Sequence, residues 1–468
     1  MILFSKKISS FALLVIGLIL FRAVLNYSIP LMDKTEARYA EISRIMEETN
    51  DFVTPQIDYN VPFWAKPPLS TWLSALSIKV FGENEFAVRF PYLLLNVLVL
   101  LLIGRYAKEK KLDFFIPAFI LLTIPEFLIH TGVVSTDTAL AFCVTLVMIS
   151  FWEAVKTTKN HLWKYMFFIG LGLGMLAKGP IIFILTIPPI FVWTVFFKEF
   201  KAVWKNFQWF LGIALVAFIT IPWYYLAELK TPGFIDYFII GEHFKRFFDS
   251  SWQGDKYGFP KSQPMGMIWL FLVAFAIPWI LLIIQKLWQK KLTILKDKWV
   301  LFLVLWLLWT PGFFTISKSL IHPYIMPVMV PIALLITYWW DEFKNIKRII
   351  YSALIFPVLA LLFFIGMQFI TKSEFYINSD KYLIENNSEV NIPIYYWQTK
   401  SYSSQFYSKG KIKVIEDEQV LLTHLNTDNS FLIIIPHKRL KKIDASYLKS
   451  LQEIDKNYKN GIYLFKKE

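Results

Sequence analysis

The chain has 468 residues, of which 56% are hydrophobic and only 18% are charged. Soluble globular proteins are usually nearer half apolar and a quarter charged, so the composition argues against that class. The formal net charge is +14, but Lys and Arg lie in short clusters between apolar runs and not on one face of a soluble domain. This distribution is typical of a membrane topology signal, so we expect no nucleic-acid partner.

The first apolar stretch, from Ile8 to about Ile29, is longer than the apolar core of a typical signal peptide and lacks a small-x-small cleavage site. We therefore expect the chain to retain it as a first membrane span. The only cysteine, Cys143, lies inside a later apolar run. A lone cysteine excludes an internal disulfide and a cysteine-based metal site, so we expect it to be a small core residue.

Apolar runs recur along the chain, each with about the length that a helix needs to cross a hydrocarbon core of roughly 30 Å. They predict an all-α polytopic membrane protein with about eleven transmembrane helices, and at most about thirteen. The expected spans are roughly 8–28, 86–106, 113–130, 136–155, 162–178, 180–197, 207–227, 264–285, 299–316, 320–340 and 348–370.

Alternate short loops between these spans are basic, and the positive-inside rule places them in the cytoplasm. They are Arg105 to Lys111, Lys156 to Lys164, Lys198 to Lys205, Lys286 to Lys298 and Lys344 to Arg348, together with the N-terminal Lys6 and Lys7. The longer loops 30–85 and 228–263 then lie on the outer side. The protein is expected in a bacterial inner membrane with its N-terminus in the cytoplasm.

The composition changes after the last span. Residues 1–370 form the expected transmembrane domain, whereas residues 371–468 are polar and alternate short β-rich runs with helical patterns. This pattern predicts a small soluble C-terminal α/β domain on the outer side of the membrane.

The first outer loop carries the densest group of candidate residues. Asp33, Glu36 and Arg38 follow the first span, and Lys66 stands in the segment Pro62 to Leu69. A carboxylate can accept a hydroxyl proton while Lys and Arg stabilise charge on a departing phosphate, which suits a reaction at a lipid phosphate. The alternative is a solvated helix face on which Arg38 pairs with a carboxylate.

Other candidates map to the same side. Asp137 stands at the outer end between two spans, where it could instead cap the following helix. Arg246 is three residues past His243, so the two could share a helix face and contact a phosphate, or the segment could be an interfacial helix with basic anchors.

Lys178 and Lys318 also belong to the outer set, although either side chain could simply snorkel to the membrane surface. Arg22, Arg89 and Glu126 sit near span ends, and we expect them to snorkel as well.

At these residues the sequence resembles a known family, the polyprenyl-phosphate-dependent glycosyltransferases of the ArnT-like type, which include the lipid A aminoarabinose transferases. More distantly it is similar to the protein O-mannosyltransferases. The order and spacing of the matching stretches hold across about the first 340 residues. These stretches are 35–42, Phe63-Trp64-Ala65-Lys66-Pro67-Pro68-Leu69, 81–87, Ser135-Thr136-Asp137, Lys178-Gly179-Pro180, 242–247 and Tyr324-Ile325-Met326-Pro327.

The resemblance implies a GT-C membrane fold that takes a sugar from an undecaprenyl-phosphate-type carrier. The sugar passes to lipid A or another envelope acceptor on the outer face, generally with inversion at the anomeric centre. Carried over, the first-loop acid falls at Glu36 or Asp33, the second acid at Asp137 and the carrier-phosphate lysine at Lys66. The remaining substrate-binding residues implied are Arg38, His243, Arg246, Lys178, Lys318 and Tyr324.

Two positions depart from the family pattern. Thr35 replaces the Asp that commonly precedes the Glu, and no His follows Tyr257-Gly258 in the large loop. No cofactor is therefore expected with certainty, although a divalent cation stays open. The competing functions are a lipid-linked-sugar flippase or transporter, which needs polar or broken helices near the bilayer midplane, and a non-catalytic assembly protein.

Overall fold

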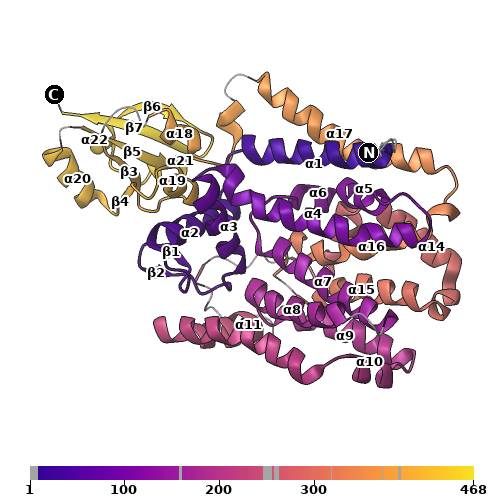
Figure 1. The fold of residues 1–468 in the computed structure, drawn as a ribbon. Coiled ribbons are helices and arrows are strands. Elements are labelled where there is room, and N and C mark those ends of the chain that lie inside the picture. The colour runs from indigo at the N-terminus through magenta and orange to yellow at the C-terminus, as the bar shows by residue number, and fades with distance from the viewer. Residues whose placement is uncertain are drawn as a thin grey trace, which may run out of the picture.

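The computed structural model describes residues 9–157, 161–245, 254, 256–257, 263–317, 319–370, 373–387, 392–428 and 430–467. Most of these residues are helical, and a small sheet lies near the C-terminus (Figure 1). Every apolar run that the sequence predicts as a span contains one helix or a pair of helices.

Five helices in the described part of the chain are long and apolar enough to cross a membrane, by length and composition. They are α1 (Ser10–Ser28), α4 (Glu85–Glu109), α7 (Thr136–Lys156), α11 (Trp209–Lys230) and α17 (Ile346–Gln368). A sixth span results if α13 (Met267–Phe275) and α14 (Trp279–Lys290) are counted together, although they bend by 109° at their break. Proline at 278 removes a backbone donor there, which accounts for the interruption.

The other predicted spans correspond to shorter helices, so the expected number of eleven stays a prediction. These helices are α5 (Ile116–Thr123), α6 (Pro125–His130), α8 (His161–Lys178), α9 (Ile181–Phe196), α15 (Lys298–Phe314), η3 (His322–Val328) and α16 (Met329–Tyr338). Pro125 divides α5 from α6, and Pro323 and Pro327 keep η3 in the tighter 3₁₀ form ahead of α16.

Burial separates the inner helices from the peripheral ones. All eight residues of α5 are buried, whereas few residues of α1 and α17 are. Both α1 and α17 lie at the edge of the helix bundle (Figure 1). Phe210 on α11 and Phe363 on α17 are 85% and 71% exposed. Apolar surface of this extent is stable against lipid and not against water, so these helices line the rim of a membrane domain.

The first outer loop contains two helices, α2 (Thr35–Thr49) and α3 (Leu69–Phe81). A short hairpin of β1 (Gln56–Asp58) and β2 (Val61–Pro62) joins them. The short helices elsewhere are α10 (Phe200–Asn206), η1 (Asp236–Lys245), η2 (Lys291–Lys296) and η4 (Trp340–Glu342).

The C-terminal domain contains one five-stranded sheet in the order β4-β3-β5-β7-β6. Its strands are β3 (Ile394–Trp397), β4 (Lys413–Ile415), β5 (Ser430–Pro436), β6 (Gln452–Lys456) and β7 (Asn460–Lys466). β3 pairs in parallel with both β4 and β5, whereas β7 pairs antiparallel with both β5 and β6. The helical segments are η5 (Ser373–Tyr376), α18 (Lys381–Glu385), α19 (Tyr402–Tyr407), α20 (Glu418–Thr427), α21 (His437–Leu440) and α22 (Ala445–Leu448).

This domain is docked on the first loop by polar contacts as well as by packing of α19 against α2. Lys381 Nζ lies 2.6 Å from Glu85 Oε1, and the Tyr407 hydroxyl donates to the same oxygen over 2.9 Å. Lys400 Nζ lies 2.8 Å from Asp58 Oδ2. The sheet domain therefore rests on the face where α2 and α3 lie (Figure 1).

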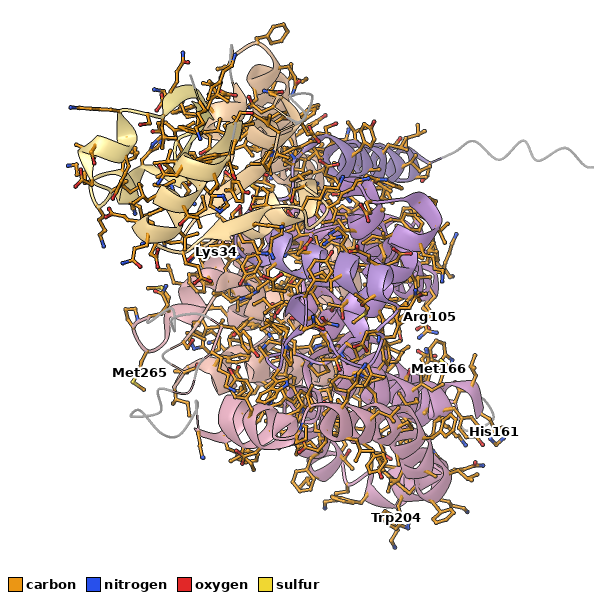
Figure 2. The ribbon with its side chains drawn as sticks, turned by 90° about the vertical axis from the view of Figure 1, so that its left-hand side faces the viewer. Lys34, Arg105, His161, Met166, Trp204 and Met265 are labelled. Carbon is orange, nitrogen blue, oxygen red and sulfur yellow. The ribbon has the colours of Figure 1, made fainter. Side chains whose placement is uncertain are left out.

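The two ends of the helices differ in what they carry. Arg105, His161 and Trp204, which belong to the basic loops, lie at one side of the molecule (Figure 2). Lys34, beside the C-terminal domain, and Met265 lie at the other. The basic loops are thus separated from the first loop and the sheet domain, as the alternation of charge predicts.

Candidate active site

Asp137 and Lys178 form an ion pair. It lies at the same end of the helix bundle as the first loop. Asp137 stands in the first turn of α7, whose N-cap is Ser135, and Lys178 is the last residue of α8. Lys178 Nζ lies 2.5 Å from Asp137 Oδ1, and the two side chains are 13% and 10% exposed. The cap and the charge pair are compatible, because the Ser135 side chain and not Asp137 accepts the first free N–H of the helix.

The turn after Lys178 needs a glycine. Gly179 has a φ of +79°, and a Cβ added there would meet the ring of Phe238 at 2.7 Å. The close approach brings η1 against the end of α8. His243 on η1 consequently lies with Nε2 3.2 Å from the carbonyl oxygen of Lys178.

Both ring nitrogens of His243 are directed to main-chain carbonyls, since Nδ1 lies 2.8 Å from the carbonyl oxygen of Phe238. Burial lowers the pKa of His243, and the nearby charge of Lys66 lowers it further. An imidazole held in this way has no ring nitrogen directed to a metal ion, so we assign His243 no metal-ligand role.

Tyr324 and Lys66 complete the cluster. The Tyr324 ring of η3 has its centroid 4.2 Å from Lys178 Nζ, which is a cation–π contact. Lys66 Nζ donates to the carbonyl oxygen of Ala65 over 2.6 Å and lies 3.7 Å from Glu242 Oε2. We call the six residues Asp137, Lys178, Tyr324, His243, Lys66 and Glu242 the Asp137 cluster.

Arg38 borders this cluster through aromatic side chains. Its guanidinium donates to the carbonyl oxygen of Tyr257 over 3.0 Å and lies 5.4 Å from the ring centroids of Tyr39 and Phe63. The sequence offered a pair between Arg38 and a carboxylate as the alternative. Among the described residues, Arg38 makes these aromatic and carbonyl contacts in its place.

Glu36 is held by Arg89. Arg89 Nε lies 2.8 Å from Glu36 Oε1 and a terminal nitrogen lies 2.7 Å from Oε2, so the pair is bidentate and both partners are buried. Burial raises the pKa of Glu36, but the charge and hydrogen bonds of Arg89 outweigh it and the pKa falls below its ordinary value. Both carboxylate oxygens of Glu36 are thus engaged.

Asp33 contacts the C-terminal domain. Its carboxylate accepts hydrogen bonds from the backbone N–H of Ser403, over 3.1 Å, and from the Ser403 hydroxyl. Burial raises the pKa of Asp33 to about 6, although the bonds from Ser403 oppose the shift. Asp33 therefore lies at the junction between the first loop and the sheet domain.

Two further predicted residues, Arg246 and Lys318, lie outside the described residues. The expectation that Arg89 and Glu126 snorkel is wrong. Arg89 is 3% exposed because it pairs with Glu36, and Glu126 is fully buried between His130 and His322. Charged side chains near span ends reach no water when neighbouring elements cover them.

The sequence missed Glu242, Arg89 and Tyr39 as parts of the site. Glu242 could have been found from its place beside His243, but its partner Lys66 is distant in the chain. Tyr39 is buried, and Asp137 and Lys178 act on it electrostatically. The pairing of residues far apart in sequence carries no local signal.

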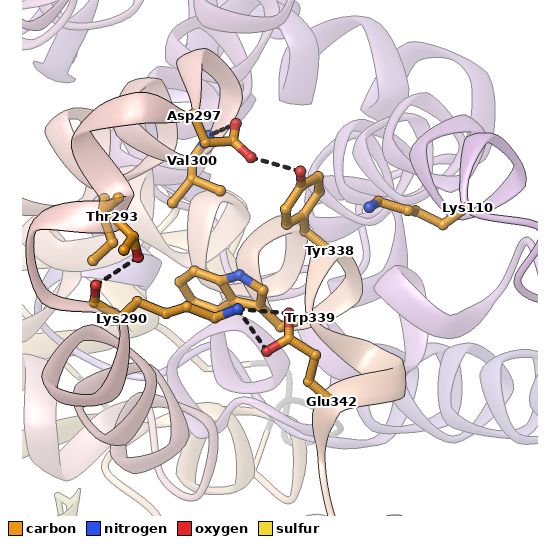
Figure 3. Close-up of a pocket in the computed structure, with 9 residues that line it drawn as sticks. Lys110, Lys290, Thr293, Asp297, Val300, Tyr338, Trp339 and Glu342 are labelled. Carbon is orange, nitrogen blue, oxygen red and sulfur yellow. Dashed lines mark hydrogen bonds and ion pairs between the residues drawn. The ribbon is translucent and has the colours of Figure 1, made fainter.

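A cavity of about 240 Å³ lies elsewhere, beside the short helix η2 (Figure 3). Lys110, Lys290, Asp297, Tyr338 and Glu342 line it. Lys290 Nζ lies 2.9 Å from Glu342 Oε1, and the Tyr338 hydroxyl donates to Asp297 over 2.6 Å. Because Lys110 follows the far end of α4 from the first loop, this cavity is remote from the Asp137 cluster.

Residues 5–238, half of the chain, match the family of dolichyl-phosphate-mannose-protein mannosyltransferases. The chain belongs to this family. The match ends just before Glu242 and includes α1 to α11 with the loops between them, and therefore Asp137, Lys178 and Lys66.

Curated relatives that are named as arabinosyl transferases, and not as mannosyltransferases, are also similar to this chain. An undecaprenyl phosphate-alpha-4-amino-4-deoxy-L-arabinose arabinosyl transferase 2 of Pseudomonas fluorescens is 28% identical over 313 residues, which cover 64% of this chain and 54% of that protein. A transferase 1 of the same description from Proteus mirabilis is 30% identical over 342 residues, which cover 69% and 58%. The chain spans little more than half the length of the curated relatives it matches.

The structure of ArnT from Cupriavidus metallidurans bound to undecaprenyl phosphate superposes with a TM-score of 0.76, covering 98% of each chain at 17% identity. This similarity confirms the predicted fold, a GT-C-type helical membrane domain with a small C-terminal sheet domain. The chain is therefore a multi-pass membrane protein.

Proposed function

We propose that this protein is an integral membrane glycosyltransferase that moves a sugar from a polyprenyl-phosphate carrier to an envelope acceptor. The Asp137 cluster carries the proposal, because it sets a carboxylate and two lysines at one face of a membrane domain. Membership of a mannosyltransferase family and the names of the relatives support a transferase and argue against a flippase.

The proposed reaction breaks the bond between the anomeric carbon and the carrier phosphate oxygen. The acceptor oxygen forms a new bond to that carbon, the phosphate leaves with the electron pair, and the acceptor proton passes to a base. Positioning and stabilisation of phosphate charge supply much of such a catalysis. Lys66 would bind the carrier phosphate, and Arg38 would border the same headgroup.

Asp137 is the proposed acceptor-orienting base. The oxygens of Glu36 are taken up by Arg89, and the carboxylate of Asp33 accepts from Ser403. Among the described residues, Asp137 has one close charged partner, Lys178, and a long contact of 3.4 Å from the Ser135 hydroxyl. It therefore retains acceptor capacity for a substrate hydroxyl.

We further propose that residues 1–370 form the transferase domain and residues 371–468 an outward domain, with the basic loops and the N-terminus in the cytoplasm. No cofactor is established for this chain. His243, whose ring nitrogens are directed to carbonyl oxygens, supplies no metal ligand in the reaction proposed at Asp137.

Mass spectrometry of the polyprenyl-phosphate pool and of envelope glycolipids, with and without the protein, tests the proposal in cells. We expect one glycosylated carrier to accumulate without the protein, and Lys66→Ala to reproduce that accumulation while it inserts normally. Lys456→Ala on β6, which pairs with Glu453 in the sheet domain, is the matched control. Wild-type glycolipids in the Lys66→Ala strain would contradict the assignment.

A further inference from the structure

Three metal-ligand side chains from two separate elements meet beside the Asp137 cluster. Glu126 and His130 lie four residues apart on α6, so they share one helix face, and His322 begins η3. His322 Nδ1 lies 2.9 Å from Glu126 Oε2, and His130 Nε2 lies 3.2 Å from Glu126 Oε1. We call these three residues the Glu-His-His cluster.

The burial of this cluster is unusual for its chemistry. Glu126 is fully buried and His130 is only 6% exposed. Among the described residues, neither ring nitrogen of His130 has a hydrogen-bond partner of acceptable geometry. A buried carboxylate needs a countercharge, which a bound cation would supply, and a buried imidazole without a partner indicates a missing ligand.

The donor set fits a particular class of ion. Two imidazoles and one carboxylate are a common ligand set for Zn²⁺ that leaves a fourth position open, whereas Ca²⁺ and Mg²⁺ prefer oxygen ligands. Metal–ligand bonds of about 2.0–2.1 Å in a tetrahedron place donor atoms roughly 3.3 Å apart. The donor atoms here all lie within 4.8 Å of one another, so small side-chain shifts would close the site.

We propose that Glu126, His130 and His322 bind one divalent transition-metal ion, with Zn²⁺ the best match to the donor set. The fourth position would be open, since the side chain of His322 is 38% exposed. The Phe275 ring stacks on His322 with centroids 4.8 Å apart and fixes the plane of the imidazole. The site is distinct from the region around His243.

The ion would position a residue of the Asp137 cluster. His322 and Tyr324 are two residues apart on η3, and the Tyr324 ring faces Lys178. A metal that ties η3 to α6 therefore fixes where the ring meets the lysine. This role is one of positioning, and metal binding itself does not depend on the proposed glycosyl transfer.

Metal analysis of the full-length protein purified in detergent tests the site directly. After chelation and equilibration with Zn²⁺, we expect about one bound ion per wild-type chain. Glu126→Gln and His322→Asn should each weaken Zn²⁺ binding at least about tenfold. The matched control is His424→Ala, whose histidine pairs with Asp428 in the sheet domain and should leave stoichiometry unchanged.

A second measurement covers the case in which Glu126→Gln does not fold. Zn²⁺ should raise the melting temperature of the wild type and of His424→Ala, and chelation should reverse the shift. His322→Asn, at a partly exposed position, should abolish the response while the protein stays folded. Equal Zn²⁺ content in the wild type, His322→Asn and His424→Ala, or none in the wild type, would overturn the site.

Discussion

Two buried ion pairs lie at the same end of the helices, and they differ in how fully their carboxylates are occupied. Glu36 receives two close bonds from Arg89 and further N–H groups from Val134 and Met32 at 3.4 and 3.5 Å. Asp137 receives one close bond from Lys178. Arginine grips a carboxylate through a fixed planar fork, whereas lysine offers a compact point charge.

The difference separates a structural acid from one that can act. Glu36 joins α2 to α4 through both of its oxygens. Asp137 joins α7 to α8 through Oδ1, and among the described residues its Oδ2 has only the 3.4 Å contact from the Ser135 hydroxyl. Both carboxylates belong to stretches that resemble the same transferase family. Their local partners, and not their membership of a motif, assign their proposed roles.

Removing the first acid should cost the most stability. Glu36→Gln leaves the Arg89 charge buried without its partner, so we expect a loss of about 3–5 kcal/mol in the free energy of unfolding. Thermal or denaturant unfolding in detergent measures this, with Glu453→Gln on the exposed edge strand as the control. Unchanged stability in Glu36→Gln would show that the pair is dispensable.

Removing the second acid should affect activity more than stability. Asp137→Asn keeps the shape of the side chain but loses the charge that accepts a proton, so we expect transfer to fall by about 10²–10³-fold. The variant should purify in wild-type yield, since Lys178 keeps partial exposure. Equal losses of activity in Asp137→Asn and in folded Glu36→Gln would erase the distinction between the pairs.

The junction between the first loop and the sheet domain should respond to pH. Burial raises the pKa of Asp33 to about 6, above its usual 3.8, so the folded state binds this proton more tightly than the unfolded state. Its contribution to stability is complete below about pH 4 and is lost as pH rises through about 6. Melting curves between these values should show a smaller pH dependence in Asp33→Asn than in the wild type; identical curves would contradict the assignment.

The smallest effect is expected from Tyr324. Tyr324→Leu removes the ring over Lys178 but keeps an apolar side chain, and a partly buried cation–π contact contributes about 0.5–2 kcal/mol. Transfer should therefore fall between about two- and thirtyfold. Steady-state rates measure this, and Tyr324→Phe should retain most of the activity because it keeps the ring.

Much of the fold follows from the sequence. The apolar runs predicted where the helices of the membrane domain lie. The β-rich runs predicted four of the five strands of the C-terminal sheet. The strand β6 (Gln452–Lys456) was missed because it is polar and mostly exposed. The breaks near Pro125 and Pro278 were missed because continuous hydropathy hides where a proline divides a helix.

The candidate site was predicted only in part. Residue types and spacing identified Asp137, Lys66 and Lys178, which the structure brings together. They could not identify the partner of Glu36, which lies 53 positions away, or that of Glu126, which lies 196 positions away. Such pairs are set by how the helices pack, and the local sequence of either partner contains no trace of the other.

The most direct test of the central claim follows the carrier itself in a purified system. Wild-type protein in detergent, supplied with the glycosylated polyprenyl phosphate that accumulates in its absence and with envelope acceptor lipids, should release free polyprenyl phosphate in step with glycosylated acceptor. Asp137→Asn, equally folded, should release almost none. Undiminished release of polyprenyl phosphate by Asp137→Asn would contradict the account. So would a glycosylated carrier that stays intact in the presence of folded wild-type protein.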